Sequence, residues 1–230
     1  MSAAACGVRV SGTGWVNGSR AGGMRGAFRR TLDARTAGAA WTEGGAFAYP
    51  VRHFGRMNAA SRRACIACAL ALRDAGLAEA EGHPLAIGLV GGNPDGSFHE
   101  NRAYFEDYVA AGRSLARGNL FVYTLPTSPL AEASIHCGLR GPVLYVGLPG
   151  ARAPALLRMA ADLLTGGEAA RMLAVDDDGR AAVGFLLEPA GGDDAWSMDG
   201  VLKRIGGART VGGVVRALAR GHAKGSDACT

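Results

Sequence analysis

Lysine is almost absent from this chain, which has only Lys203 and Lys224 among its 25 basic residues. The arginines are scattered along the sequence instead of gathered in a block, so the net charge of +5 does not indicate nucleic-acid binding. Long apolar runs are also absent, because arginine, aspartate or glycine breaks every stretch before the roughly 20 residues that a membrane helix needs. We therefore expect neither a nucleic-acid partner nor a membrane span.

Cysteines number only five, and an odd count does not suit a closed disulfide framework. The N-terminus lacks the positive segment and apolar core of a secretory signal, so the predicted location is cytoplasmic. Cys65 and Cys68 fall in a predicted buried helix, and no second pair of cysteines or histidines follows at a zinc-like spacing. We predict no metal and no cofactor.

The pattern of apolar residues predicts an α/β fold. Residues 64–72 carry no charged side chain, which predicts a buried helix capped by Asn58 or Ser61. Gly12 and Gly14 predict a turn after the first strand, residues 17–45 a loop, and 176–179 a hairpin turn. The other predicted elements are strands at 8–10, 84–90, 142–147, 171–175 and 181–188, and helices at 99–111, 153–164 and 211–219. Such alternation predicts a layered, mixed sheet with helices on its faces.

One segment resembles a known family. The run Gly-Leu-Arg-Gly-Pro at 138–142, after a helix of small residues, is similar to the stretch that precedes the active site of β-ketoacyl synthases. The end of the predicted buried helix, residues 72–77, resembles the first long helix of that family. The resemblance implies half of a thiolase-type fold in a domain spanning 1–190. Residues 191–230 are then expected to form a polar extension with one short helix and a frayed tail.

The same comparison points to a lost catalytic residue. Active members of the family have Thr-Ala-Cys-x-Ser-Gly after the strand, whereas this chain has Leu-Pro-Gly-Ala-Arg-Ala at 148–153. The nucleophile position therefore falls on Gly150, which has no side chain to hold an acyl group as a thioester. In the family, the two catalytic histidines lie in the C-terminal half of the fold. By resemblance, the residues after Pro189 are too few to form that half. We expect no ketosynthase activity from this chain by itself and assign no catalytic residue.

Two sets of residues are candidates for binding. By resemblance, an aromatic-rich region lies near the acyl pocket and the dimer contact of the family, although ordinary core packing would explain it equally well. Its candidate residues are Tyr104, Phe105, Tyr108, Phe121, Tyr123 and Leu148. The family's edge strand pairs with its counterpart in a second subunit, and the matching residues here are Pro142, Val143, Leu144, Tyr145 and Val146.

These features predict a non-catalytic subunit that resembles a chain length factor. Its expected partner is a full-length β-ketoacyl synthase in polyketide, aryl polyene or fatty-acid-type biosynthesis. Scattered arginines would also suit an acidic acyl carrier protein. Two alternatives stay open: a stand-alone homodimer that binds acyl groups or acyl carrier protein, and an acyltransferase or hydrolase that uses another nucleophile, such as Cys137 or Ser128.

Overall fold

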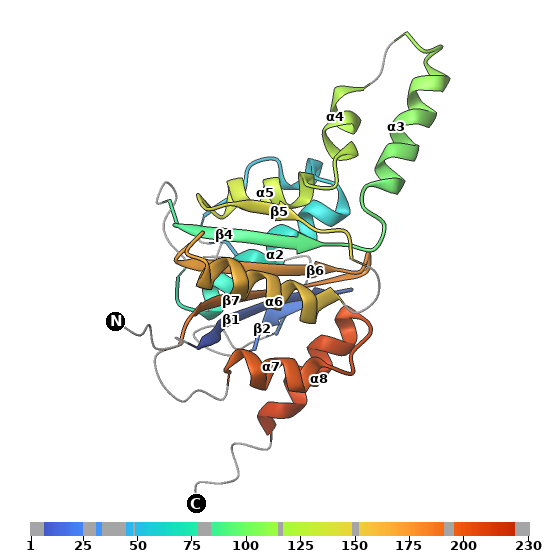
Figure 1. Ribbon diagram of the computed structural model, residues 1–230. Helices are drawn as coiled ribbons and strands as arrows, with labels where there is room; N and C mark the ends of the chain where they lie inside the picture. Colours follow the sequence, from blue (N-terminus) through green and yellow to red (C-terminus); the bar gives the residue numbers. More distant parts are fainter. Residues whose placement is uncertain are drawn as a thin grey trace, which may run out of the picture.

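The computed structural model describes residues 7–24, 31–33, 45–47, 49–77, 84–114, 117–148, 152–190 and 196–223. Its centre is a mixed sheet of seven strands (Figure 1). The strands are β1 (Val8–Asn17), β2 (Arg20–Gly23), β3 (Thr31–Asp33), β4 (Ile87–Gly92), β5 (Val143–Tyr145), β6 (Arg171–Asp177) and β7 (Ala181–Pro189). The helices are η2 (Phe54–Arg56), α2 (Ala59–Asp74), α3 (Phe98–Ala110), α4 (Gly118–Phe121), η3 (Val122–Thr124), α5 (Ser128–His136), α6 (Arg152–Thr165), α7 (Met198–Ile205) and α8 (Val211–Ala223).

The strands lie in the order β3-β2-β1-β7-β6-β4-β5. β4 runs parallel to both of its neighbours, with Leu89 opposite Val143 of β5 and opposite Leu173 of β6. The other neighbouring strands are antiparallel. The predicted hairpin is confirmed as β6 and β7, and Asp178 in its turn accepts hydrogen bonds from the amides of Arg180 and Ala181. The fold is therefore the expected layered α/β arrangement.

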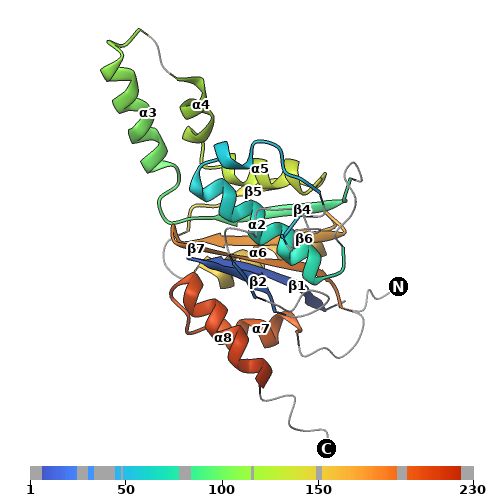
Figure 2. The same cartoon turned by 180° about the vertical axis from the view of Figure 1, so that it is seen from behind.

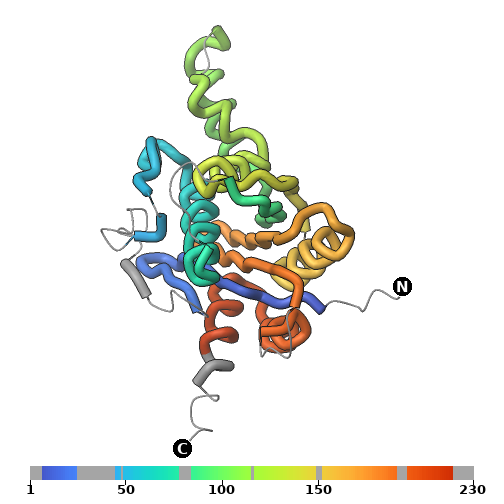
Figure 3. The backbone as a smooth tube through the Cα atoms, turned by 90° about the vertical axis from the view of Figure 1, so that its left-hand side faces the viewer, coloured from blue at the N-terminus to red at the C-terminus, as the bar shows by residue number. Residues whose placement is uncertain are grey.

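Helices cover both faces of the sheet, as the view along its edge shows (Figure 3). On one face, α2 and α5 pack together with the inward side chains of β1, β4, β6 and β7. On the other face, α6, α7 and α8 enclose a second core that includes Phe185 and Leu187 of β7. The predicted buried helix is confirmed as α2, and Asn58 caps it by accepting a hydrogen bond from the Ser61 amide.

The prediction of a turn at Gly12 and Gly14 is wrong, because both glycines lie inside the ten-residue strand β1. They allow α2 to approach the sheet closely. A Cβ atom at Gly14 would lie 2.2 Å from the carbonyl oxygen of Ala67, and one at Gly12 equally close to that of Ala71. The loop predicted for 17–45 is also incorrect, since β2 pairs antiparallel with β1 and β3 pairs antiparallel with β2, which extends the sheet there.

The described residues beyond Pro189, 196–223, contain two helices, α7 and α8, where the sequence predicts one. α7 was missed because charged residues alternate with its apolar side chains. Those apolar side chains nevertheless share one face, on which Val201 and Ile205 are fully buried. Together with Leu218 of α8 they close the core beside α6. This part of the chain therefore belongs to the body of the fold.

α3 and α4 project from the body as an arm (Figures 1 and 2). The arm leaves the sheet after β4 and extends beyond β5, the last strand in the sheet order. No residue of α3, α4 or η3 is buried. Within the described part of the chain, no helix combines the length and apolar character needed to cross a bilayer.

Candidate functional site

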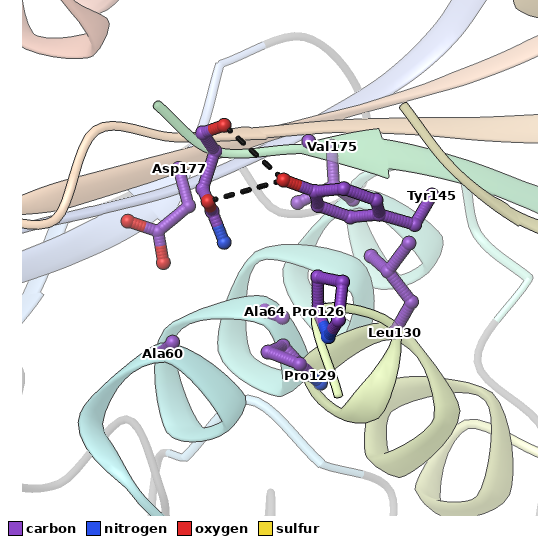
Figure 4. Close-up of a pocket in the computed structure, with 10 residues that line it drawn as sticks. Ala60, Ala64, Pro126, Pro129, Leu130, Tyr145, Val175 and Asp177 are labelled. Carbon is purple, nitrogen blue, oxygen red and sulfur yellow. Dashed lines mark hydrogen bonds between the residues drawn. The ribbon is translucent and has the colours of Figure 1, made fainter. Parts of the chain in front are cut away.

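A small pocket lies where the carboxyl ends of β4, β5 and β6 meet the N-terminal ends of α2 and α5 (Figure 4). Its volume of ≈ 20 Å³ admits about one water molecule. The lining residues are Ala60, Ala64, Gly92, Asn93, Pro126, Pro129, Leu130, Tyr145, Val175 and Asp177. Most of these side chains are apolar, and the polar groups come from Asn93, Tyr145 and Asp177. The pocket has no room for an acyl chain in this conformation.

Tyr145 is held at the rim by Asn93. The Tyr145 hydroxyl lies 3.4 Å from Asn93 Oδ1 and 3.5 Å from the Asn93 carbonyl oxygen (Figure 4). Burial raises the pKa of the Tyr145 phenol, so the hydroxyl stays protonated and donates to these acceptors at neutral pH. This tyrosine therefore links the end of β5 to the segment that leads into the arm.

The buried Asp177 forms an ion pair with the partly buried Arg63 of α2. Arg63 Nε donates to both carboxylate oxygens, at 3.1 Å and 3.0 Å, and the Gly179 amide donates to Oδ1 at 2.7 Å. Burial nevertheless raises the pKa of Asp177, because removal from water disfavours the carboxylate more than these partners favour it. The pair ties the end of β6 to the α2 layer.

The neighbouring Asp176 pairs with Arg152, the first residue of α6. Arg152 Nε donates to Asp176 Oδ1 at 2.7 Å, and both side chains are buried. Burial raises the pKa of Asp176 to about 6, against the opposing effect of the guanidinium. Successive residues of a strand point to opposite faces, so this pair holds α6 while the Asp177 pair holds α2.

Neither Ser128 nor any cysteine among the described residues is set up to act as a nucleophile. Burial raises the pKa of Cys137 to about 12 and the pKa values of Cys65 and Cys68 well above their ordinary range, so all three remain thiols at neutral pH. The Ser128 hydroxyl is buried and donates to the carbonyl oxygen of Val122. The described residues also contain no group of three or more potential metal ligands among histidine, cysteine, aspartate and glutamate.

Comparison with solved structures identifies the fold. A β-ketoacyl synthase from Burkholderia phymatum STM815 superposes with a TM-score of 0.57 and 17% identity, over 80% of this chain and 59% of that one. A ketosynthase, ApeO, in complex with its chain length factor, ApeC, from Xenorhabdus doucetiae gives 0.53 and 16%, over 81% and 80%. AntDE:AntF, a type II polyketide synthase acyl carrier protein in complex with its ketosynthase, gives 0.54 and 14%, over 80% and 62%. This chain has the β-ketoacyl synthase fold.

The likeness is structural and partial. The chain spans about three fifths of the length of the Burkholderia β-ketoacyl synthase. No protein-family model and no curated protein sequence matches it. The comparisons thus confirm the expected thiolase-type half-fold, and they concern the fold alone.

The predicted elbow, residues 148–153, falls at the start of α6. Gly150, at the predicted nucleophile position, lies outside the described residues, as do its two neighbours Pro149 and Ala151. Leu148, the first residue of this segment, packs against the core on the α6 side. Arg152 is the first residue of α6, so its ion pair with Asp176 fixes the point at which the helix begins.

The aromatic candidates do not line the pocket of Figure 4. Tyr104, Phe105 and Tyr108 lie on α3, Phe121 ends α4, and Tyr123 lies in η3. Their possible role in an interface stays a prediction. From the predicted dimer strand, Tyr145 reaches the pocket, while Val143 and Leu144 are exposed on the last strand of the sheet, with no further strand beyond them in the described residues.

Sequence reasoning missed the ion pairs of Asp176 and Asp177. It placed Asp176 and Asp177 in the hairpin turn, but both belong to β6 and only Asp178 lies beyond the strand. Their arginine partners are 24 and 114 residues away along the chain. The available signal was two consecutive acidic residues directly after a run of apolar strand residues, a position that the sheet partly buries.

Proposed function

We propose that this chain is a non-catalytic ketosynthase-fold subunit with a role like that of a chain length factor. In this role it pairs with a full-length β-ketoacyl synthase that carries out condensation in polyketide, aryl polyene or fatty-acid-type biosynthesis. An acyl carrier protein then delivers substrates to the pair. The observation that carries the proposal is the combination of a ketosynthase fold with Gly150 at the predicted nucleophile position.

The described side chains support a non-catalytic role. A substitute nucleophile would need an accessible hydroxyl, or a thiol with a lowered pKa. Cys137 has the opposite shift, and the Ser128 hydroxyl is buried against a backbone carbonyl. This disfavours an acyltransferase or hydrolase that uses either residue.

The structural neighbours support the partner. A ketosynthase in complex with its chain length factor is among the proteins of similar fold. The exposed Val143 and Leu144 on the last strand also offer an apolar edge to a second chain. Unpaired strand edges of this kind favour association with another edge.

Co-purification with a synthase tests the proposal. The chain is co-expressed with each full-length β-ketoacyl synthase found in its gene neighbourhood, with an affinity tag on the synthase only. We expect a stable complex of one copy of each, and product formation by the synthase that falls when the chain is left out. A synthase that neither retains the chain nor changes its products when the chain is present would refute the proposal.

A further inference from the structure

Exposed arginines lie around the start of α8, beside the turn of the β6–β7 hairpin. Asp178 in that turn accepts a hydrogen bond from the amide of Val211, the first residue of α8. Arg180 lies in the same turn, directly before β7, and Arg209 lies two residues before the helix. Both side chains are exposed, so the hairpin and the start of α8 each present a cationic group to solvent.

Two more exposed arginines, Arg20 and Arg216, lie next to the same place. A Cβ atom at Gly212, in the first turn of α8, would lie 3.6 Å from Arg216 Nη1 and 3.3 Å from Asn17 Nδ2. Asn17 is paired with Arg20 of β2 on one side and with Ala181 of β7 on the other. Paired residues of neighbouring strands point to the same face of a sheet. Because Ala181 belongs to the core that α8 helps to enclose, Arg20 also points to the α8 side.

The positive charge at this place is not balanced from within the described part of the chain. None of the four guanidinium groups forms an ion pair or a hydrogen bond there. The nearby carboxylate of Asp178 accepts hydrogen bonds from three backbone amides, those of Arg180, Ala181 and Val211. The cationic groups therefore stay available to an anionic partner. We call the set the arginine surface: Arg20, Arg180, Arg209 and Arg216.

The chemistry of the arginine surface indicates an acidic protein as its partner. Among the described residues, no large apolar side chain is exposed on β1, β2, β7 or α8, the elements that form or adjoin this surface. Membrane-surface helices insert apolar side chains, and proteins that bind single-stranded nucleic acid stack bases on aromatic ones, so neither ligand suits it. Planar guanidinium groups pair in a bidentate manner with carboxylates. A protein face that carries several carboxylates therefore fits.

We propose that the arginine surface docks the acidic face of a second protein, which within the proposed function is the acyl carrier protein. The choice of the carrier protein rests on the proposed function, whereas the need for an acidic partner rests on the charges of the surface. The surface adjoins β2, β1 and β7, while β5 is the last strand at the far end of the sheet order. α8 and β5 lie on opposite sides of the molecule (Figure 1). A carrier protein and a synthase therefore bind this chain at separate places.

Fluorescence anisotropy of a labelled acyl carrier protein from the gene neighbourhood, titrated with the purified chain, tests the docking. The Kd should increase as sodium chloride is raised from about 50 mM to about 300 mM, because salt screens exposed charges. At low salt, the double variant Arg180→Glu/Arg216→Glu should raise the Kd at least ~10-fold, because two attractive charges become repulsive. The matched control is Arg140→Glu/Arg158→Glu, which changes the net charge equally at exposed positions outside the arginine surface and should leave the Kd within ~2-fold.

Two further probes test the class of the partner. Duplex DNA and vesicles of phosphatidylglycerol offer phosphate groups in place of carboxylates. We expect both to bind the wild type at least ~10-fold more weakly than the carrier protein does at the same salt concentration, because neither presents carboxylates on a protein face. If either probe binds as tightly as the carrier protein, and loses binding in Arg180→Glu/Arg216→Glu, the acidic-protein partner is wrong.

Hydrogen exchange of the wild type covers the case in which the double variant folds poorly. Addition of the carrier protein should slow the exchange of amides in residues 178–181 and 209–216. The docking surface is overturned if the carrier protein does not bind the wild type, binds both double variants equally, or protects only other segments. These results are independent of synthase binding, which co-purification measures separately as the test of the proposed function.

Discussion

Arg152 and Asp176 join the first residue of α6 to the carboxyl end of β6, through a buried hydrogen-bonded ion pair of 2.7 Å. Arg63 and Asp177 form the corresponding link to α2 on the opposite face of the sheet. The two aspartates are adjacent in the chain, so one strand end anchors both helical layers. Arg152 comes two residues after Gly150, the predicted nucleophile position, and its ion pair fixes the start of α6.

The Asp176 pair predicts a pH dependence of stability. The pKa of Asp176 is about 6 in the folded chain, against ~3.9 for an unfolded aspartate. Between these values the folded state binds more protons, so this residue stabilises the fold fully below about pH 4, and the contribution is lost as pH rises through 6. We expect Asp176→Asn to remove this part of the slope, by at most ~1.4 kcal/mol per pH unit.

Urea unfolding from pH 4 to pH 7.5 measures this slope in the wild type and in Asp176→Asn. The exposed Asp162, on α6, provides the control substitution Asp162→Asn, whose slope should follow the wild type. Parallel slopes for the wild type and Asp176→Asn would contradict the raised pKa.

The contact between α2 and β1 predicts a large effect at Gly14. We expect Gly14→Ala to lower the free energy of unfolding by about 3 kcal/mol, because its Cβ would overlap the Ala67 carbonyl and the helix would have to shift. Gly55→Ala, where a Cβ meets nothing within 4 Å, should change stability by less than ~0.5 kcal/mol. Similar denaturation midpoints for the two variants would show that the helix moves freely.

The raised pKa values of the thiols predict that the chain does not become acylated. After incubation with an acyl carrier thioester at pH 7.5, intact-mass analysis should find the unmodified mass, because burial raises the pKa of Cys137 to about 12 and keeps it protonated. A full-length β-ketoacyl synthase serves as the positive control. A stable acyl adduct that disappears in Cys137→Ala would instead support an enzyme with a substitute nucleophile.

The exposed edge strand predicts sensitivity at Leu144. Leu144→Lys should abolish co-purification with the synthase, or precipitate the chain, because the substitution places an unpaired charge in the proposed contact. Ala219→Lys, at an exposed position of α8, adds the same charge away from β5 and should leave the complex intact. Retention of the complex by Leu144→Lys would place the synthase contact elsewhere.

The two C-terminal helices should contribute to global stability. Leu218 is fully buried in the core beside α6, so Leu218→Ala is expected to cost about 3 kcal/mol and to lower the unfolding midpoint of the whole chain. The control is Arg216→Ala, at an exposed site of the same helix, with little expected change. If far-ultraviolet circular dichroism reveals a separate early transition in Leu218→Ala, α7 and α8 unfold independently of the sheet.

Local patterns in the sequence predicted most of the elements. The uncharged middle of α2 and its Asn58 cap, the alternation of strands and helices, and the β6–β7 hairpin all depend on residues close together in the chain. The run Gly-Leu-Arg-Gly-Pro at 138–142 was enough to suggest the ketosynthase fold, which the solved structures confirm. Patterns of this length determine the type of an element because its hydrogen bonds and caps form within a few residues.

Long-range packing decided the rest. Gly12 and Gly14 suggest a turn when viewed alone, and only the approach of α2 explains why a strand contains them. The arginine partner of Asp177 is 114 residues away, and α7 packs against β1, which lies near the other end of the chain. The arm is likewise exposed because α3 makes its main contacts with η3 and α4 and not with the sheet. Whether a side chain is buried depends on which segments pack together, and a local sequence pattern does not specify that packing.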